Sequence, residues 1–251
     1  MRLSGNTVLI TGGATGIGYA MAEAFLQAGS EVLICGRRAD RLEQARARHP
    51  SLHIKACDLT KPADRAALVE WATKTSGRLN VLVNNAGVQR DIDFSKGLAE
   101  FEAGSNEIAI NLEAPVVLSG LFVPHLAGKE NSAIINVSSG LGFVPAAKMP
   151  VYCATKAGLH VFSMTLRHQL ARVGIKVFEV IPPAVDTELN PEGRAKRGGF
   201  KANLAPETFV AAVMKGLEND AFEIGYGMTE GTRNASRAEI EKAFVEMNRR
   251  M

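Results

Sequence analysis

The sequence has few features typical of secreted or membrane proteins. Its three cysteines, Cys35, Cys57 and Cys153, are odd in number and far apart, which fits neither a disulfide framework nor a CxxC metal clip. Nowhere do 18 apolar residues follow one another, so we expect no transmembrane helix and no membrane partner. The first ten residues hold no secretory apolar segment. We therefore expect reduced thiols and a cytoplasmic protein.

Net charge and metal-ligand patterns are also sparse, and each absence excludes a class of partner. Lys and Arg number 29 and Asp and Glu 26, so the formal net charge is +3, too small to indicate nucleic-acid binding. The five histidines form no HExxH or other ligand spacing, so no metal site is expected. Of the 251 residues, 46% are hydrophobic, which is enough for one large core and excludes a mainly disordered chain.

Short apolar, β-branched runs alternate with stretches of helical period along the chain. Runs that are almost wholly apolar suit strands covered on both faces, and hence a parallel sheet with helices on each side. Their regular alternation predicts an α/β protein: a single-domain, doubly wound Rossmann fold over residues 1–251, with a seven-stranded parallel sheet flanked by helices. The predicted strands are 7–10, 32–35, 53–56, 81–83, 133–137, 176–181 and, more weakly, 222–225.

One segment breaks this alternation. Residues 190–205 (NPEGRAKRGGFKANLA) are polar, basic and glycine-bearing, with no strand pattern and little helical period. A loop of this length inside a compact domain is usually functional or mobile. We interpret it as a substrate lid whose cations face water; the sharper alternative is that they attract an anionic substrate. These cations are Arg194, Lys196, Arg197 and Lys201.

A glycine cluster follows the first predicted strand and opens the first predicted helix. In TGGATGIG at 11–18, glycines allow the backbone to approach a pyrophosphate, and the helix N-terminus offers N–H groups to its charge. The spacing is GxxxGxG rather than GxGxxG, so the prediction depends on its place between strand and helix. We expect Gly12, Gly16 and Gly18 to bind a dinucleotide.

The end of the second predicted strand indicates which dinucleotide. A site for NAD has an acidic residue there, which accepts hydrogen bonds from the ribose hydroxyls. This strand instead ends in Cys35-Gly36-Arg37-Arg38, and guanidinium groups suit a 2′-phosphate. NADP(H) is therefore favoured, with Arg37 the stronger candidate and Arg38 the weaker, while NAD(H) stays possible. The alternative is that these arginines only solvate a helix.

Tyr152 and Lys156 stand four residues apart at the start of a predicted helix, so they share one helix face. A neighbouring ammonium stabilises a phenolate and brings the pKa of tyrosine, about 10 when unperturbed, toward the range of a working acid–base catalyst. YxxxK alone occurs often by chance. Polar residues at 138–139 and at 84–87 strengthen the interpretation, because both follow apolar strands, where ligands gather in open α/β sheets.

Together these motifs resemble the short-chain dehydrogenases/reductases. The resemblance covers roughly residues 4–190. The sequence around the motifs looks closest to the DltE-type oxidoreductases of that family. The resemblance implies hydride transfer between a nicotinamide and the carbonyl or alcohol carbon of a small molecule, in a homodimer or homotetramer. The residues that carry it are TGGATGIG at 11–18, Asp58, NNAG at 84–87, Asn111, Ser139, YCATK at 152–156 and the turn at 182–187.

The resemblance also implies roles for individual residues. Tyr152 is the expected general acid–base, and Ser139 would hold and polarise the carbonyl oxygen. Lys156 would lower the pKa of the tyrosine and bind the nicotinamide ribose, and Asn111 would support a water relay to that lysine. Besides Tyr152 and Lys156, further cofactor contacts are implied at Ile17, Asp58, Leu59, Asn85, Ala86, Gly87, Pro182, Val185 and Thr187.

The chain departs from the family in two places. Pro183 follows Pro182 where the family commonly has glycine, and a proline has no N–H to donate to a cofactor, although Val185 could supply one. Thr15 stands where many NADP-dependent members have a basic residue, so the NADP prediction rests mainly on Arg37. Two alternatives stay open: an epimerase or dehydratase using the same Tyr–Lys pair, and a dinucleotide-sensing regulatory protein.

Overall fold

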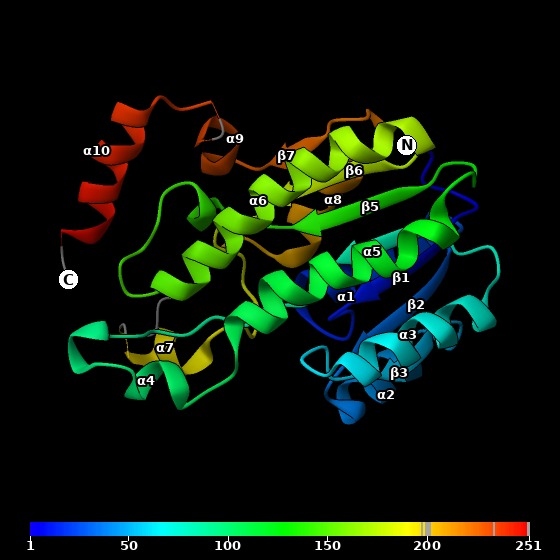
Figure 1. Ribbon diagram of the computed structural model, residues 1–251, viewed down its shortest axis with the longest axis horizontal. Coiled ribbons are helices and arrows are strands. Elements are labelled where there is room, and N and C mark those ends of the chain that lie inside the picture. The colour runs from blue at the N-terminus through cyan, green and yellow to red at the C-terminus, as the bar shows by residue number, and fades with distance from the viewer. Residues whose placement is uncertain (197, 199–201, 233, 250–251) are drawn as a thin grey trace.

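Seven parallel strands form the centre of the protein (Figure 1). The computed structural model describes residues 1–196, 198, 202–232 and 234–249. The strands pair in the order β3-β2-β1-β4-β5-β6-β7, so the chain order reverses between β1 and β4, as in a doubly wound fold. The predicted architecture is confirmed. The strands are β1 (Thr7–Thr11), β2 (Glu31–Gly36), β3 (His53–Ala56), β4 (Val81–Asn84), β5 (Ala133–Val137), β6 (Lys176–Ile181) and β7 (Glu223–Gly225).

The burial of each strand follows its place in the sheet. Every residue of the central strands β1, β4 and β5 is buried, whereas edge strand β3 is partly exposed throughout. In register, Val8 of β1 lies between Val32 of β2 and Val81 of β4. Continuous Val, Ile and Leu runs are therefore required by the centre of the sheet, since helices cover both of its faces.

Two layers of helices cover the sheet. On one face, Phe25 and Phe209 pack in the same core cluster, and on the other face Phe122 occupies the second cluster. In Figure 1, α5 and α6 run across the front of the sheet and α8 lies behind it. The first face is covered by α1 (Gly16–Gln27), α2 (Ala39–Arg48) and α8 (Pro206–Glu218), and the second by α3 (Pro62–Thr75), α5 (Ala114–Leu126) and α6 (Pro150–Leu170).

In the described part of the chain, four shorter or peripheral helices lie outside these layers. The last of them, α10, contacts the loop that follows β5: the side-chain amide of Asn248 donates to the carbonyl of Pro145 (3.1 Å), and its oxygen accepts from the N–H of Ala147 (2.8 Å). The C-terminal helix is thereby fixed against the loop that follows β5. These helices are α4 (Ala99–Glu102), α7 (Pro191–Lys196), α9 (Met228–Thr232) and α10 (Arg237–Asn248).

Among the described residues, the stretch Ala109–Leu126 is long and apolar enough to cross a membrane by length and composition. Asn111 and Glu113 interrupt it, so it is not a continuous apolar run. Half of this stretch is buried inside the protein, and Leu118 and Phe122 belong to the core beneath it. Its apolar residues thus include those that a core helix needs to cover a sheet.

Helix α7 corrects the expectation of little helical structure between residues 190 and 205. Asn190 begins the helix as its cap, because its side-chain oxygen accepts from the N–H of Gly193 (3.0 Å), and Pro191 suits the first helical turn. The N–H of Asp186 donates to the carbonyl of Leu204 (2.9 Å), which closes the base of the segment. The predicted lid cations lie outside the described residues, in whole or in their side chains: Arg194, Lys196, Arg197 and Lys201.

Candidate active site

The predicted site residues that follow strands gather at one edge of the sheet, because the carboxyl ends of parallel strands all point the same way. The glycine loop follows β1, the NNAG run follows β4, Ser139 follows β5, and the turn at 182–187 follows β6. Helix α6 begins at the same edge with Tyr152 in its first turn. Sequence positions as distant as 16 and 187 are thus neighbours.

The glycine loop packs so closely that side chains are excluded. Gly12 has a φ of 64°, and a Cβ there would lie 2.9 Å from the Cα of Ala86. A Cβ on Gly18 would lie 2.4 Å from the side-chain nitrogen of Asn85, and Gly16 has a φ of 57°. Glycine is required at these three positions by conformation or by close approach.

Thr11 and Asn85 tie the glycine loop to the loop after β4. The side-chain amide of Asn85 donates to the carbonyls of Thr11 (2.9 Å) and Gly12 (3.2 Å). The Thr11 hydroxyl accepts from the N–H groups of Asn85 and Ala86, both at 3.0 Å. Both the side chain and the backbone N–H of Asn85 are therefore used to shape the loop.

The start of α1 is suited to an anion. Thr15 occupies the N-cap position but makes no capping hydrogen bond with its side chain, and the first turn holds no acidic residue. N–H groups at a helix start carry partial positive charge and bind phosphates when nothing else accepts from them. Together with the glycine cradle, this geometry fits the pyrophosphate of a dinucleotide.

The turn after β6 completes the pocket. The carbonyl of Pro182 accepts from the N–H of Gly140 (3.0 Å), which joins this turn to the one after Ser139. Thr187 reaches α1, since a Cβ on Gly16 would meet its methyl group at 3.0 Å. Val185 is buried in the core cluster against which Ile17 packs.

Asp58 and Arg37 lie at the ends of the next strands. Asp58 accepts hydrogen bonds from the N–H (3.1 Å) and hydroxyl (2.8 Å) of Thr60. These bonds, and the nearby Arg37 charge, hold the pKa of Asp58 below its usual value. Arg37 itself is exposed. Leu59 is buried, and its carbonyl accepts from the guanidinium of Arg65 (2.8 Å).

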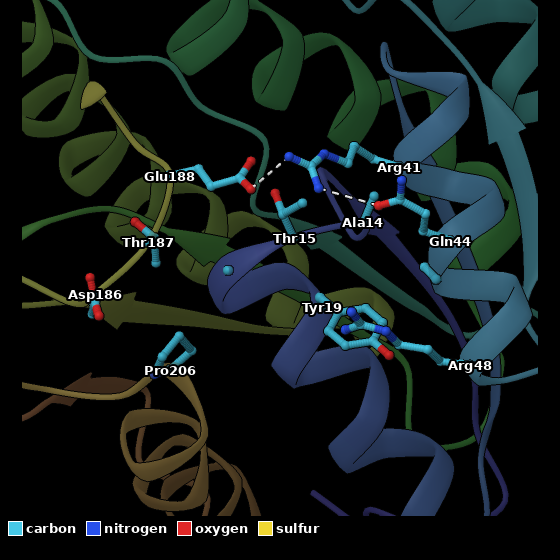
Figure 2. Close-up of a pocket in the computed structure, with 12 residues that line it drawn as sticks. Ala14, Thr15, Tyr19, Arg41, Gln44, Arg48, Asp186, Thr187, Glu188 and Pro206 are labelled. Atoms are coloured by element: carbon cyan, nitrogen blue, oxygen red, sulfur yellow. Dashed lines mark hydrogen bonds and ion pairs between the residues drawn. The ribbon is translucent and has the colours of Figure 1, made fainter. Parts of the chain in front are cut away.

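Arg38 and Arg41 converge on one carboxylate, that of Glu188. Arg38 donates to Glu188 (2.9 Å) and to the Thr15 hydroxyl (3.2 Å), and Arg41 donates to the other oxygen of Glu188 (3.0 Å). Figure 2 shows Arg41 and Glu188 meeting beside Thr15, at the rim of a cavity of about 440 Å³. The Arg38 side chain thus does more than solvate a helix.

Tyr152 and Lys156 are both buried, at 5% and 4% exposure. The Lys156 ammonium donates to the carbonyl of Val137 (2.7 Å) and lies 5.7 Å from the centre of the Tyr152 ring. Burial raises the pKa of Tyr152 to about 12, although its hydrogen bond with Ser139 lowers it. Burial lowers the pKa of Lys156 to about 8, and the charge of Glu179 opposes that shift.

The pKa of Tyr152 is thus raised, not lowered as the sequence predicted. Desolvation disfavours the phenolate, and it also weakens the cation that was expected to stabilise that phenolate. In this geometry Tyr152 is a protonated phenol at neutral pH, whereas Lys156 is mostly an ammonium ion.

Asn111 joins three parts of the site from a π-helical turn, Ala109–Glu113. Its side-chain oxygen accepts from the N–H of Val88 (2.9 Å), and its amide donates to the Val88 carbonyl (2.8 Å) and the Thr155 hydroxyl (3.2 Å). Both N–H groups of the amide are used, so a water relay would have to reach this residue through an oxygen atom. A Cβ on Gly87 would lie 3.4 Å from the Asn111 oxygen and 3.7 Å from the Lys156 nitrogen.

Several carboxylates near the site were missed by sequence reasoning. Glu107 is fully buried, accepts from the N–H of Arg90 (3.1 Å), and adds to the raised pKa of Tyr152. Glu179 is fully buried within β6, where a lone carboxylate in the apolar run VFEVI was an available signal. No comparable pattern marks Glu107 or Glu188.

The chain belongs to the short-chain dehydrogenase family, whose model matches residues 6–198. It is 48% identical over 248 residues to the uncharacterized oxidoreductase DltE of Bacillus subtilis (strain 168), covering 99% of this chain and 98% of that protein. The fold, the glycine cradle and the Tyr–Lys pair are therefore those of an oxidoreductase family.

Two solved structures resemble this one closely. A short-chain dehydrogenase from Sphingobium yanoikuyae in complex with NADPH has a TM-score of 0.80 and 30% identity, covering 96% of this chain and 95% of that one. The 3-ketoacyl-(acyl-carrier-protein) reductase from Brucella melitensis complexed with NADH has a TM-score of 0.79 and 26% identity, covering 90% and 99%. A nicotinamide dinucleotide is thus supported, without a preference between the two kinds.

Proposed function

We propose that the protein transfers a hydride between NADP(H) and a small-molecule carbonyl or secondary alcohol. The observation that carries this proposal is the convergence of Ser139, Tyr152 and Lys156 at the edge of the sheet that also holds the glycine cradle. When bound, the nicotinamide supplies or accepts the hydride. The protein supplies the proton, holds the oxygen and excludes water.

The pyrophosphate would be held by the glycine loop and the N–H groups that begin α1. The ribose next to the nicotinamide would lie by Lys156 and Gly87, since a Cβ on that glycine would nearly reach the lysine nitrogen. Asp58 and the backbone of Ala86 would lie on the adenosine side.

Tyr152 is suited to donate a proton to the carbonyl oxygen during reduction. Its raised pKa keeps the phenol protonated at neutral pH, and a general acid must hold its proton until charge develops on the acceptor. The Ser139 hydroxyl is hydrogen-bonded to Tyr152, so both can address the same oxygen atom. Oxidation of an alcohol would require the phenolate and is less favoured by this geometry.

NADP(H) over NAD(H) is supported by the end of β2. No carboxylate stands directly at the end of that strand, and Arg37 is exposed there with its charge close enough to lower the pKa of Asp58. An arginine can hold a 2′-phosphate through two hydrogen bonds, which a ribose hydroxyl cannot match.

Replacement of Arg37 by aspartate tests the preference. Arg37→Asp removes the cation and introduces an acceptor for ribose hydroxyls, so we expect NADPH binding to weaken and NADH binding to strengthen. Fluorescence titration of both reduced cofactors would measure this change. An unchanged NADPH preference would remove Arg37 from the site.

The identity of the carbonyl substrate is open to a direct survey. A panel of aliphatic, aromatic and acidic aldehydes and ketones, each assayed by NADPH consumption, would identify the substrate class. Turnover of any member supports the proposed reaction. Silence across the panel with intact cofactor binding would favour the dinucleotide-sensing alternative.

A further inference from the structure

Glu179 is a buried carboxylate in the middle of β6, with no exposed surface. Burying a charge is costly unless it is paired and hydrogen-bonded. Two partners meet that need: the hydroxyl of Ser138 donates to one carboxylate oxygen (2.5 Å), and Nδ1 of His160 donates to the other (2.8 Å). Each carboxylate oxygen of Glu179 therefore has a hydrogen-bond partner. Packing in the sheet alone would require only an apolar side chain at this position.

Both partners belong to segments that carry the catalytic groups. Ser138 stands between Val137, whose carbonyl accepts from Lys156, and Ser139, which is hydrogen-bonded to Tyr152. The backbone N–H of Ser138 also donates to the carbonyl of Val180 in β6 (2.8 Å).

His160 makes the second attachment from α6, the helix that bears Tyr152 and Lys156. It lies four residues after Lys156, on the same face of that helix. The ring of Phe143, in the loop after Ser139, packs on the His160 ring with centroids 4.5 Å apart. One carboxylate therefore joins β6, the end of β5 and α6 at the catalytic edge; Figure 1 shows these three elements side by side.

We propose that Glu179 is a positioning residue for the reaction: through Ser138 and His160, its carboxylate holds residues 137–139 and α6 in the register that Ser139, Tyr152 and Lys156 need. The proposal rests on the proposed function for the roles of those three residues. It does not depend on the identity of the carbonyl substrate.

The charge of Glu179 has a second effect on the same groups. It raises the pKa of His160 through their hydrogen bond, and its attraction partly offsets the lowering of the Lys156 pKa by burial. The other charges that face His160 are those of Arg167 on α6 and Glu223 on β7. These two pair with each other at 3.3 Å, so they largely cancel.

Glu179→Gln tests the proposal because it keeps the side-chain shape and removes the charge. We expect kcat to fall about tenfold to a hundredfold, the cost of small misplacements of reacting groups. The KM for NADPH should stay within about twofold, since the glycine cradle is untouched. The alkaline limb of the pH–rate profile should move to lower pH, because Lys156 loses the charge that favours its ammonium form.

A spectroscopic measurement makes the test independent of turnover. In protein labelled with ¹³C-lysine, the Lys156 resonance, assigned by its loss in Lys156→Arg, should titrate at lower pH in Glu179→Gln than in the wild type. Ser138→Ala provides a second variant, which removes the attachment but keeps the charge. It should lower kcat and leave the Lys156 titration unchanged.

Ser163→Ala is the matched control. The Ser163 hydroxyl accepts from the side-chain amide of Asn136 (2.9 Å), so this buried pair also joins β5 to α6, but it involves neither Glu179 nor the side chains of residues 137–139. It should leave the pH profile and the Lys156 titration unchanged. The proposal is overturned if Glu179→Gln behaves like the wild type in both measurements, or if Ser163→Ala reproduces its effects.

The two proposals can fail separately. If the wild-type protein reduces no carbonyl compound, the proposed function is contradicted. The Lys156 titration would still show whether the charge of Glu179 acts on that lysine.

Discussion

Burial sets the protonation states of the two central side chains. Tyr152 loses hydration of its phenolate, and Lys156 loses hydration of its ammonium, so their pKa values move toward about 12 and about 8. The tyrosine is thereby kept as a proton donor at neutral pH. The lysine is charged at neutral pH, but its pKa of about 8 lies close to that pH. A small change in the surrounding charge can consequently alter the lysine more readily than the tyrosine.

We predict that Glu188 competes with the 2′-phosphate of NADP(H) for the guanidinium group of Arg38. It accepts from both Arg38 and Arg41 beside Thr15. Glu188→Gln should strengthen binding of NADPH relative to NADH by about fivefold, which corresponds to ~1 kcal/mol, the upper range for an exposed ion pair. Parallel fluorescence titrations with the two reduced cofactors would measure the change.

Glu43→Gln is the control for that variant. It breaks another exposed arginine–glutamate pair, with Arg46 on the same helix α2, but away from Thr15. The ratio of the two affinities should not change. Weaker NADPH binding in Glu188→Gln would show that Glu188 orients Arg38 for phosphate instead of competing with it.

At the scale of elements, His160 couples α6 to β6 through Glu179, and its charge links that contact to pH. Its pKa is raised by the hydrogen bond to Glu179. Folding therefore gains stability from protonated His160 at pH values below its ordinary pKa of about 6.5. That gain is lost as the pH rises through the raised value in the folded protein.

The pH dependence of unfolding tests this coupling. The free energy of unfolding of wild type minus that of His160→Gln should be largest at mildly acidic pH and should decrease toward alkaline pH. Urea denaturation at a series of pH values would measure both proteins. A difference that is constant across pH, or that grows on the alkaline side, would contradict the assignment.

The elements were largely predictable, because buried parallel strands are continuous apolar runs with sharp ends. The runs 53–56, 133–137 and 176–181 coincide with β3, β5 and β6. Helix α7 was missed, since its six residues are too few to show a period, and only the cap at Asn190 marks its start.

The candidate site was predictable where the residues stand in short motifs, such as the glycine loop and the Tyr–Lys pair. Contacts between distant residues were not. The hydrogen bond between Glu179 and Ser138 joins residues that are 41 positions apart in the sequence. The bond between Glu188 and Arg38 joins residues that are 150 positions apart. These pairs form only when the chain folds, so no spacing between nearby residues in the sequence predicts them. The raised pKa of Tyr152 escaped prediction for the same reason, because it follows from burial.

At the scale of the whole molecule, α5 and α6 leave large apolar side chains exposed on the outside of the protein. Val116 and Leu121 on α5 and Val161 and Met164 on α6 are examples. Exposed apolar patches often mark association surfaces, and we predict that a second copy covers this one. Met164→Glu should then shift the protein toward a smaller assembly, measured by analytical ultracentrifugation.

Met228→Glu is the control for that change. Among the described residues, Met228 on α9 is the most exposed large hydrophobic side chain, at 84%, and it belongs to neither α5 nor α6. The same added charge there should leave the assembly unaltered. A wild-type protein that sediments as a monomer at all concentrations would contradict the prediction.

Cytoplasmic location and the absence of nucleic-acid or membrane partners stay predictions from the sequence alone.

The central claim is that the chain transfers a hydride with Tyr152 as the proton donor. The most direct measurement uses NADPH doubly deuterated at C4 of the nicotinamide, a carbonyl that the wild type reduces, and mass spectrometry of the alcohol. Wild-type protein should place one deuterium on the carbonyl carbon. Tyr152→Phe should bind NADPH equally well and lose about a hundredfold to ten-thousandfold in rate, the usual worth of a general acid. An alcohol without deuterium, or undiminished turnover by Tyr152→Phe, would contradict the account.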